Sequence, residues 1–204
     1  MSALSSSVSI TRYQVDGKLK APILETVAAG LKKHAIFEID DPSLEKAVGW
    51  TSFEKPYQPD FGGSSFVYGN VLVFSLRIDR KAIPPKLVKK HMAIELDRRL
   101  SESGRPYLSR NEKERIREQV IDHLYATVPA TPHIYDIFWN YEDAALWFFS
   151  NLKAANETLE TLFLQSFDVT LIRMIPYTAA FYSSDLSDTQ KDTLLDLRQT
   201  PFRG

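Results

Sequence analysis

Basic side chains concentrate in one segment of this chain, and their density suggests binding to a polyanion. Residues 77–118 contain thirteen Lys and Arg against seven Asp and Glu, a net charge of +6, whereas the rest of the 204 residues carries −7. A nucleic-acid backbone is bound by Lys and Arg at phosphate spacing, and no sequence motif is needed. We therefore predict eleven phosphate-contacting residues: Arg77, Arg80, Lys81, Lys86, Lys89, Lys90, Arg98, Arg99, Arg110, Lys113 and Arg117.

The spacing of three of these lysines supports the prediction. Lys86, Lys89 and Lys90 stand at i, i+3 and i+4, so they are neighbours on one helix turn and repel one another. A bound polyanion would relieve that repulsion. The alternative is a solvated helix face with Glu95, Asp97 and Glu114 as partners of the basic residues nearby. We expect the cations to share one concave surface.

Metal and nucleophile chemistry has weaker support. The chain has no cysteine, which excludes a disulfide scaffold, a thiolate zinc site and a cysteine nucleophile. His91 and Glu95 are spaced i, i+4, but no HExxH pattern accompanies them. A two-metal nuclease site would have to draw on dispersed groups: Glu118, Asp122, His123, Asp136, Glu142 and Asp143. We predict no catalytic residue, no metal and no cofactor, and a nuclease remains the second hypothesis.

Aromatic residues offer a further possibility. Phe138, Trp139, Trp147 and Phe148 could stack on unpaired bases, but they lie in predicted strands, and we expect them in the core. Residues 62–65, Gly-Gly-Ser-Ser, lack the lysine and spacing of a phosphate-binding loop.

The first half of the chain predicts a mixture of strands and one helix. Alternating residues from Val8 to Val15 predict a strand, and Pro22 then begins a helix that ends at Lys33. Further predictions are a short strand at 35–39, a helical turn at 43–46, a loop at 55–65, and strands at 66–68 and 71–78. The last of these is nearly all apolar, which indicates burial on both faces.

Two consecutive helices come next. Pro84-Pro85 begins the first, which ends near Gly104 and offers an apolar stripe at Leu87, Ala93, Leu96 and Leu100. Ser109 and Glu112 have the spacing of a capping box, so the second helix begins there, and Ile116, Val120 and Leu124 form its buried side. Their short connection predicts an antiparallel helical hairpin.

After the two helices, the sequence again has the two-residue alternation typical of strands. We predict a strand at 134–141, a turn at Glu142-Asp143, a returning strand at 144–149, a helix from Leu152, and a strand at 169–176. A short helix capped by Ser187, with Leu194, Leu195 and Leu197, lies within 183–199.

This order predicts an α+β fold: an antiparallel-rich sheet body with packed helices and an inserted basic two-helix hairpin. The predicted parts are a body at 7–82 and 130–178, the hairpin at 83–129, and a tail at 179–204. The longest apolar run, Ala144–Phe149, is too short for a membrane span, and no leader pattern opens the chain. We expect a cytoplasmic protein without a membrane partner.

The ordered combination of elements over about residues 7–178 resembles the RdgC family of bacterial recombination-associated proteins. The matching features are Gly49-Trp50, the strand VLVFSLRIDRK at 71–81, Ile83-Pro84-Pro85, the helix SRNEKERIREQVIDHLYATVP at 109–129, Phe138-Trp139, and the helix from Leu152. Two departures stand out. The chain is expected to be a short form without the family's further C-terminal domain, and Pro129 is followed by Ala130 where members place an aromatic residue.

The resemblance implies sequence-independent binding of double-stranded DNA by a homodimer, whose ring encircles the duplex. It also implies association with the nucleoid and indirect antagonism of the RecA recombinase, which is restrained when the protein occupies DNA. A metal-dependent DNA exonuclease is the alternative, and so is a protein-interaction module that uses the basic hairpin.

Overall fold

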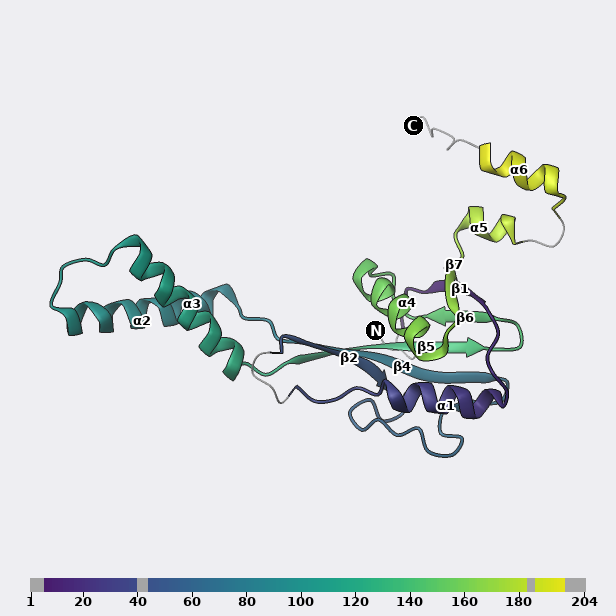
Figure 1. Cartoon of the computed structure of the whole chain (residues 1–204), viewed down its shortest axis with the longest axis horizontal. Coiled ribbons are helices and arrows are strands. Elements are labelled where there is room, and N and C mark those ends of the chain that lie inside the picture. The colour runs from purple at the N-terminus through teal and green to yellow at the C-terminus, as the bar shows by residue number, and fades with distance from the viewer. Residues whose placement is uncertain (1–5, 40–43, 183–185, 197–204) are drawn as a thin grey trace. The chain divides into compact units, whose positions relative to one another are not determined.

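The computed structural model describes residues 6–39, 44–182 and 186–196. Figure 1 shows the helices and strands in their chain order. Within the described ranges the elements are β1 (Thr11–Asp16), α1 (Ile23–Lys33), β2 (Lys46–Thr51), β3 (Val67–Tyr68), β4 (Val71–Arg80), α2 (Pro85–Ser103), α3 (Arg110–Thr127), β5 (Thr131–Asn140), β6 (Ala145–Phe148), α4 (Lys153–Phe167), β7 (Thr170–Arg173), α5 (Pro176–Phe181) and α6 (Asp188–Asp196).

The strands form one curled antiparallel sheet of order β2-β4-β5-β6-β1-β7, and β3 pairs with β4. Residues Leu72 to Arg77 of β4 are all buried, so this strand is covered on both faces as predicted. The predicted turn at Glu142-Asp143 does join two paired strands, since Ile137 of β5 lies opposite Phe148 of β6. The α+β fold class and the antiparallel-rich sheet are therefore confirmed.

The chain divides into two compact units. The first, the sheet unit, comprises Met1–His34, Trp50–Leu76 and Tyr135–Gly204. The second, the hairpin unit, comprises Ala35–Gly49 and Arg77–Ile134.

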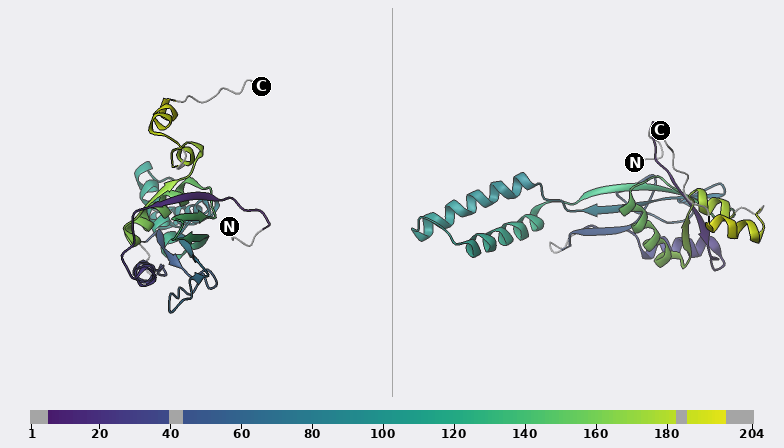
Figure 2. Two further views of the ribbon diagram at one scale, coloured as in Figure 1. Left: turned by 90° about the vertical axis from the view of Figure 1, so that its right-hand side faces the viewer. Right: turned by 90° about the horizontal axis from the view of Figure 1, so that it is seen from above.

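The sheet unit is held together by an aromatic core beneath two helices. Helices α1 and α4 lie on the same face of the sheet (Figure 2). Trp139 is 4.8 Å from Phe163 and 5.3 Å from Phe167, measured between ring centroids. A Cβ atom on Gly30 of α1 would lie 2.6 Å from the backbone oxygen of Ser166, so glycine is required where α1 meets α4.

The segment before Trp50 corrects the prediction. We expected a helical turn at 43–46, but Lys46 begins β2, and Ser43 lies outside the described residues. The strand predicted at 35–39 is reduced to a single bridge at Ala35. Gly49 explains the packing here, because a Cβ atom would lie 2.4 Å from the backbone nitrogen of Ile36. Glycine at this position therefore allows β2 to approach the backbone at Ile36 closely.

Two smaller differences concern the second half. Helix α5 was not predicted; Pro176 begins it, whereas we expected the last strand to reach that residue. The predicted C-terminal helix is present as α6, with the Ser187 hydroxyl accepting a hydrogen bond from the Gln190 amide, while Leu197 lies outside the described residues.

Candidate nucleic-acid interface

The helical hairpin forms where the sequence places its start and stop signals. Pro84 precedes α2, and Gly104, at φ +62°, ends it in the left-handed conformation that glycine adopts most easily. The Ser109 hydroxyl accepts from the Glu112 amide, and the Glu112 carboxylate accepts from the Ser109 amide, which completes the predicted capping box of α3.

A small apolar core fixes the two helices against each other. Ile116, Val120 and Leu124 of α3 are buried together with Leu108 of the connecting loop. Seven hydrophobic residues of α2 and the segments flanking the helices are partly buried against them: Ile83, Leu87, Val88, Met92, Leu96, Leu100 and Val128. Ala93, which we expected in this stripe, is exposed. Val88 and Met92 take its place, because the partly buried residues Val88, Met92, Leu96 and Leu100 recur every fourth position.

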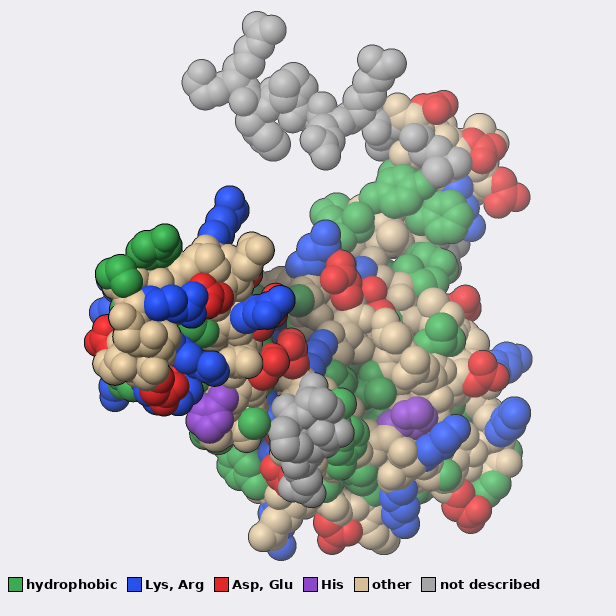
Figure 3. Space-filling view, turned by 60° about the vertical axis from the view of Figure 1, so that its left-hand side comes forward, with side chains coloured by type: hydrophobic (Ala, Val, Ile, Leu, Met, Phe, Trp, Pro, Cys, Tyr) green, Lys and Arg blue, Asp and Glu red, His purple; other side chains and the backbone are tan. Residues whose placement is uncertain are grey.

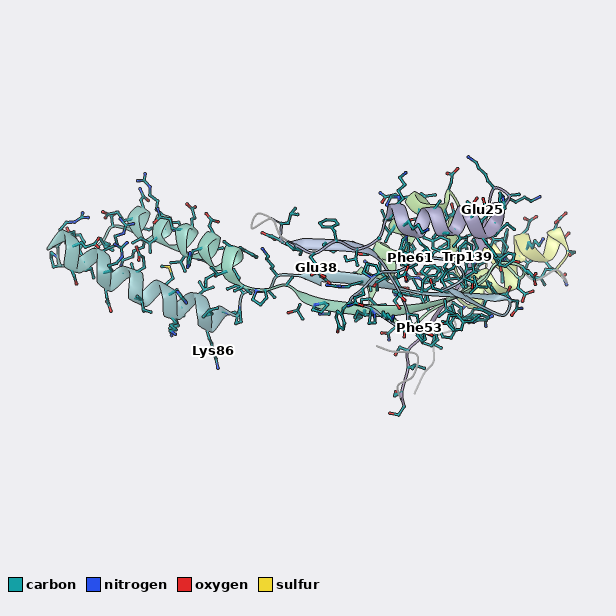
Figure 4. All side chains as sticks on the ribbon, turned by 90° about the horizontal axis from the view of Figure 1, so that it is seen from below. Glu25, Glu38, Phe53, Phe61, Lys86 and Trp139 are labelled. Atoms are coloured by element: carbon teal, nitrogen blue, oxygen red, sulfur yellow. The ribbon has the colours of Figure 1, made fainter. Side chains whose placement is uncertain are left out.

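The lysine cluster, defined as Lys86, Lys89 and Lys90, lies on the first two turns of α2. All three residues are exposed, and none forms an ion pair with the described part of the chain. Figure 4 shows Lys86 pointing away from α3. Residues 82–94 contain no Asp or Glu, so no local carboxylate neutralises the cluster. The helix dipole disfavours Lys86 in the first turn of α2, and the three lysines repel one another.

A second cationic stripe lies on the first eight residues of α3, at Arg110, Lys113 and Arg117. These residues are spaced i, i+3 and i+7, so they share one side of the helix. All three are exposed. Arg117 has only a long contact to Glu114, 4.0 Å between Nη1 and Oε1, with both side chains about 60% exposed. Such a pair contributes little and exchanges readily.

The two cationic groups occupy opposite ends of the antiparallel hairpin. At 1.5 Å rise per residue, Ser103 lies thirteen positions and about 20 Å beyond Lys90 along α2. Figure 3 shows that Lys and Arg side chains on the visible face of the hairpin are interspersed with Asp and Glu.

Arg98 and Arg99 are engaged locally. Arg98 contacts Glu95 through a bidentate pair of hydrogen bonds and donates to Glu102 at 2.6 Å. Arg99 donates to Glu95 at 3.1 Å. Hydrogen bonds from these two guanidinium groups lower the pKa of Glu95 to about 2. Both arginines therefore form ion pairs with carboxylates of α2, as expected for the alternative of a solvated helix face.

A hollow of about 510 Å³ lies between α2 and α3 near the connecting loop. Arg99, Arg105 and Arg115 line it together with Glu112. Arg105 donates to Glu112 at 2.6 Å, and this bond lowers the pKa of Glu112 to about 2. Arg115 is exposed and has no ion pair among the described residues, so it is a candidate contact that the sequence reasoning missed. Only the packing of α3 against α2 reveals it.

The three residues nominated around the end of β4 differ in accessibility. Arg77 is 4% exposed and Lys81 is 7% exposed. Arg77 donates to Asp79 at 2.8 and 2.6 Å and to Glu38, labelled in Figure 4, at 3.0 Å. Its guanidinium group thus neutralises carboxylates inside the hairpin unit. Arg80 is exposed. We leave Arg77 and Lys81 out of the candidate interface.

Two of the carboxylates considered for a nuclease accept hydrogen bonds from neighbouring side chains. Asp136 is 4% exposed and accepts a hydrogen bond from the Ser75 hydroxyl at 2.8 Å. Asp143 accepts from the side-chain amide of Asn140 in the β5–β6 turn. Among the described residues, no group of three His, Asp or Glu side chains is arranged to hold a metal ion.

The aromatic residues of β5 and β6 lie mostly in the core. Trp139 is 1% and Phe148 is 0% exposed, whereas Phe138 and Trp147 are partly buried. Phe138 packs on Phe149 with ring centroids 4.9 Å apart. The core interpretation of Trp139 and Phe148 is confirmed.

Every helix in the described part of the chain is too short or too polar to cross a lipid bilayer. No protein-family model matches the sequence, and no curated protein sequence matches it.

Proposed function

We propose that the chain binds double-stranded DNA without sequence preference, through contacts between the helical hairpin and backbone phosphates. The observation that carries this proposal is the lysine cluster. Lys86, Lys89 and Lys90 are exposed, unpaired among the described residues and free of neighbouring acids, at a helix end where their charges are unfavourable. Binding to a polyanion would make this arrangement favourable.

Six hairpin cations without a local ion pair in the described residues form the proposed interface: Lys86, Lys89, Lys90, Arg110, Lys113 and Arg115. Arg80 and Arg117 are available as additional contacts. Lys and Arg contacts to phosphates position a protein on DNA but carry no sequence information. We therefore expect similar affinities for unrelated sequences.

The resemblance to the RdgC family extends the proposal. In that case the chain would act as a homodimer associated with the nucleoid and would restrain RecA by occupying DNA. Sedimentation velocity with and without a short duplex tests whether the chain forms a homodimer. A homodimer has twice the mass of a single chain, whereas a monomer has the mass of one chain.

Fluorescence anisotropy with two labelled 20-base-pair duplexes of unrelated sequence tests the binding itself. We expect affinities within about threefold of each other and a steep loss of affinity with salt. Absence of binding at 50 mM NaCl, or a strong sequence preference, would contradict the proposal. The same samples with Mg²⁺ are run on a gel, and degradation of the duplex there would favour the nuclease instead.

A further inference from the structure

The loop between α2 and α3 presents an aromatic side chain to solvent. Tyr107 in this loop is 74% exposed, more than any other large hydrophobic side chain in the described ranges. Single exposed hydrophobic residues are common on protein surfaces and need no function. Two properties distinguish Tyr107: the residues next to it are held in place, and cationic side chains stand on both sides of it.

The loop is tied down before and after Tyr107. Arg105 donates a hydrogen bond to Glu112 at 2.6 Å. Pro106 restricts the backbone φ angle of the position just before the tyrosine. Leu108, the residue after it, is 6% exposed and belongs to the apolar core of the hairpin. A ligand that contacts the tyrosine ring therefore has little of the backbone left to order.

Two arginines near this loop are available for a phosphate. Arg110, three positions after Tyr107, and Arg115, which lines the hollow between α2 and α3, are both exposed. Neither has an ion pair among the described residues. Leu108 lines the same hollow as Arg115, so this arginine and the tyrosine loop border one space. Proteins bind single-stranded nucleic acid by this combination, in which bases stack on aromatic rings and cations bind the phosphates.

The carboxylates at the hollow are already neutralised. Glu102 accepts a hydrogen bond from Arg98 at 2.6 Å, and Glu112 accepts one from Arg105 at 2.6 Å. The charge of each carboxylate is therefore balanced by an arginine, and Arg115 keeps its own charge for an incoming anion.

We propose that this end of the hairpin binds the single-stranded part of a partly duplex DNA, with an unpaired base stacked on Tyr107 and the adjoining phosphate bound by Arg115. The inference rests on the DNA binding proposed above and specifies the form of the DNA. Inside a duplex each base is stacked between its neighbours, so a tyrosine ring reaches the face of a base only where pairing ends. Every base has a π-face, so such stacking adds no sequence preference.

Fluorescence anisotropy of the full chain with three labelled DNAs tests the proposal. All three share one 20-base-pair duplex: the first is blunt, the second carries an overhang of four thymidines, and the third carries four abasic nucleotides, which have the same phosphates but no bases. We expect the thymidine overhang to be bound about fivefold or more tightly than the abasic overhang. Arg115→Gln should weaken binding to both overhangs alike, because a phosphate contact does not depend on the base.

Three tyrosine variants separate stacking from other effects. Tyr107→Leu should remove the preference for the thymidine overhang. Tyr107→Phe should keep it, because stacking does not need the hydroxyl group. Tyr57→Leu, a matched change at a tyrosine of the sheet unit that is 62% exposed, should keep it as well.

Equal affinities for the thymidine and abasic overhangs would overturn the inference, and so would a Tyr107→Leu variant that keeps the natural preference. Either result concerns the overhang alone, because binding to the blunt duplex is measured in the same series. Absence of binding to all three DNAs would instead contradict the proposed function, and this inference with it.

Discussion

Neutralising the lysine cluster should halve the salt dependence of DNA binding. The perturbation is the triple variant Lys86→Gln, Lys89→Gln and Lys90→Gln. These residues are exposed and make no ion pair with the described residues, so their removal deletes no contact that holds the hairpin together. The variant helix should be as stable as the natural one or slightly more stable, because repulsion at its N-terminus is reduced.

The expected magnitude follows from counterion release. Each neutralised phosphate contributes about −0.9 to the slope of log K against log salt, so six contacts give a slope of about −5.4 and three give about −2.7. Between 50 and 200 mM salt, the natural chain should lose roughly 2000-fold in affinity, whereas the variant should lose roughly 40-fold.

The assay is fluorescence anisotropy of a labelled 20-base-pair duplex from 50 to 300 mM NaCl. The matched control is Lys20→Gln, Lys32→Gln and Lys33→Gln, which removes three exposed lysines of the sheet unit and changes the net charge equally. Circular dichroism verifies that both variants fold. If the two variants show the same slope, or if the cluster variant keeps the natural slope, the reasoning is refuted.

Three further predictions concern the hairpin. Glu95→Gln should remove the ion pairs that this carboxylate makes with Arg98 and Arg99, while Arg98 keeps its bond to Glu102. DNA affinity at 50 mM salt should rise by several-fold, whereas Glu157→Gln in α4 should leave it unchanged; equal effects of both would contradict local pairing. Ser109→Ala should cost about 1 kcal/mol in urea unfolding through loss of the α3 cap, while Ser109→Asp should preserve stability. The pKa values of Glu95 and Glu112 are lowered to about 2, so the stability from their arginine bonds is complete above pH 4.5 and is lost as pH falls toward 2. Thermal unfolding followed by circular dichroism should therefore show a smaller decrease between pH 5 and pH 2.5 for the Glu95→Gln, Glu112→Gln variant than for the natural chain.

The elements with strong local signals could be predicted from the sequence. The capping box at Ser109 and the glycine at 104 place the ends of α3 and α2 within one residue of their observed positions. Alternating residues likewise predicted β5 and its return in β6. These signals act over a few residues, so they do not depend on the tertiary structure.

The segment before Trp50 shows where local signals fail. Leu44-Glu45-Lys46 resembles a helical turn, but β2 begins within it. Its strand conformation goes with two contacts, the close approach of Gly49 to Ile36 and the pairing of β2 with β4. Both contacts join segments that are separated in the sequence, so the intrinsic helix or strand propensity of residues 43–46 does not reveal them.

The candidate site was predictable in part. The spacing of Glu95, Arg98 and Arg99 at i, i+3 and i+4 already indicates that these arginines pair within their own helix. The burial of Arg77 against Asp79 could not be predicted from the sequence. Both faces of β4 are covered, so its residue pattern does not distinguish buried from exposed side chains. The exposure of Arg115 beside the hairpin hollow depends on how α3 packs on α2.

Lysine acetylation mapped by mass spectrometry, with and without a saturating duplex at low salt, tests the proposed interface most directly. We expect a several-fold loss of reactivity on DNA binding at Lys86, Lys89, Lys90 and Lys113, and no change at Lys20, Lys32 and Lys33. Unchanged reactivity of the four hairpin lysines, or equal protection of all seven, would contradict it.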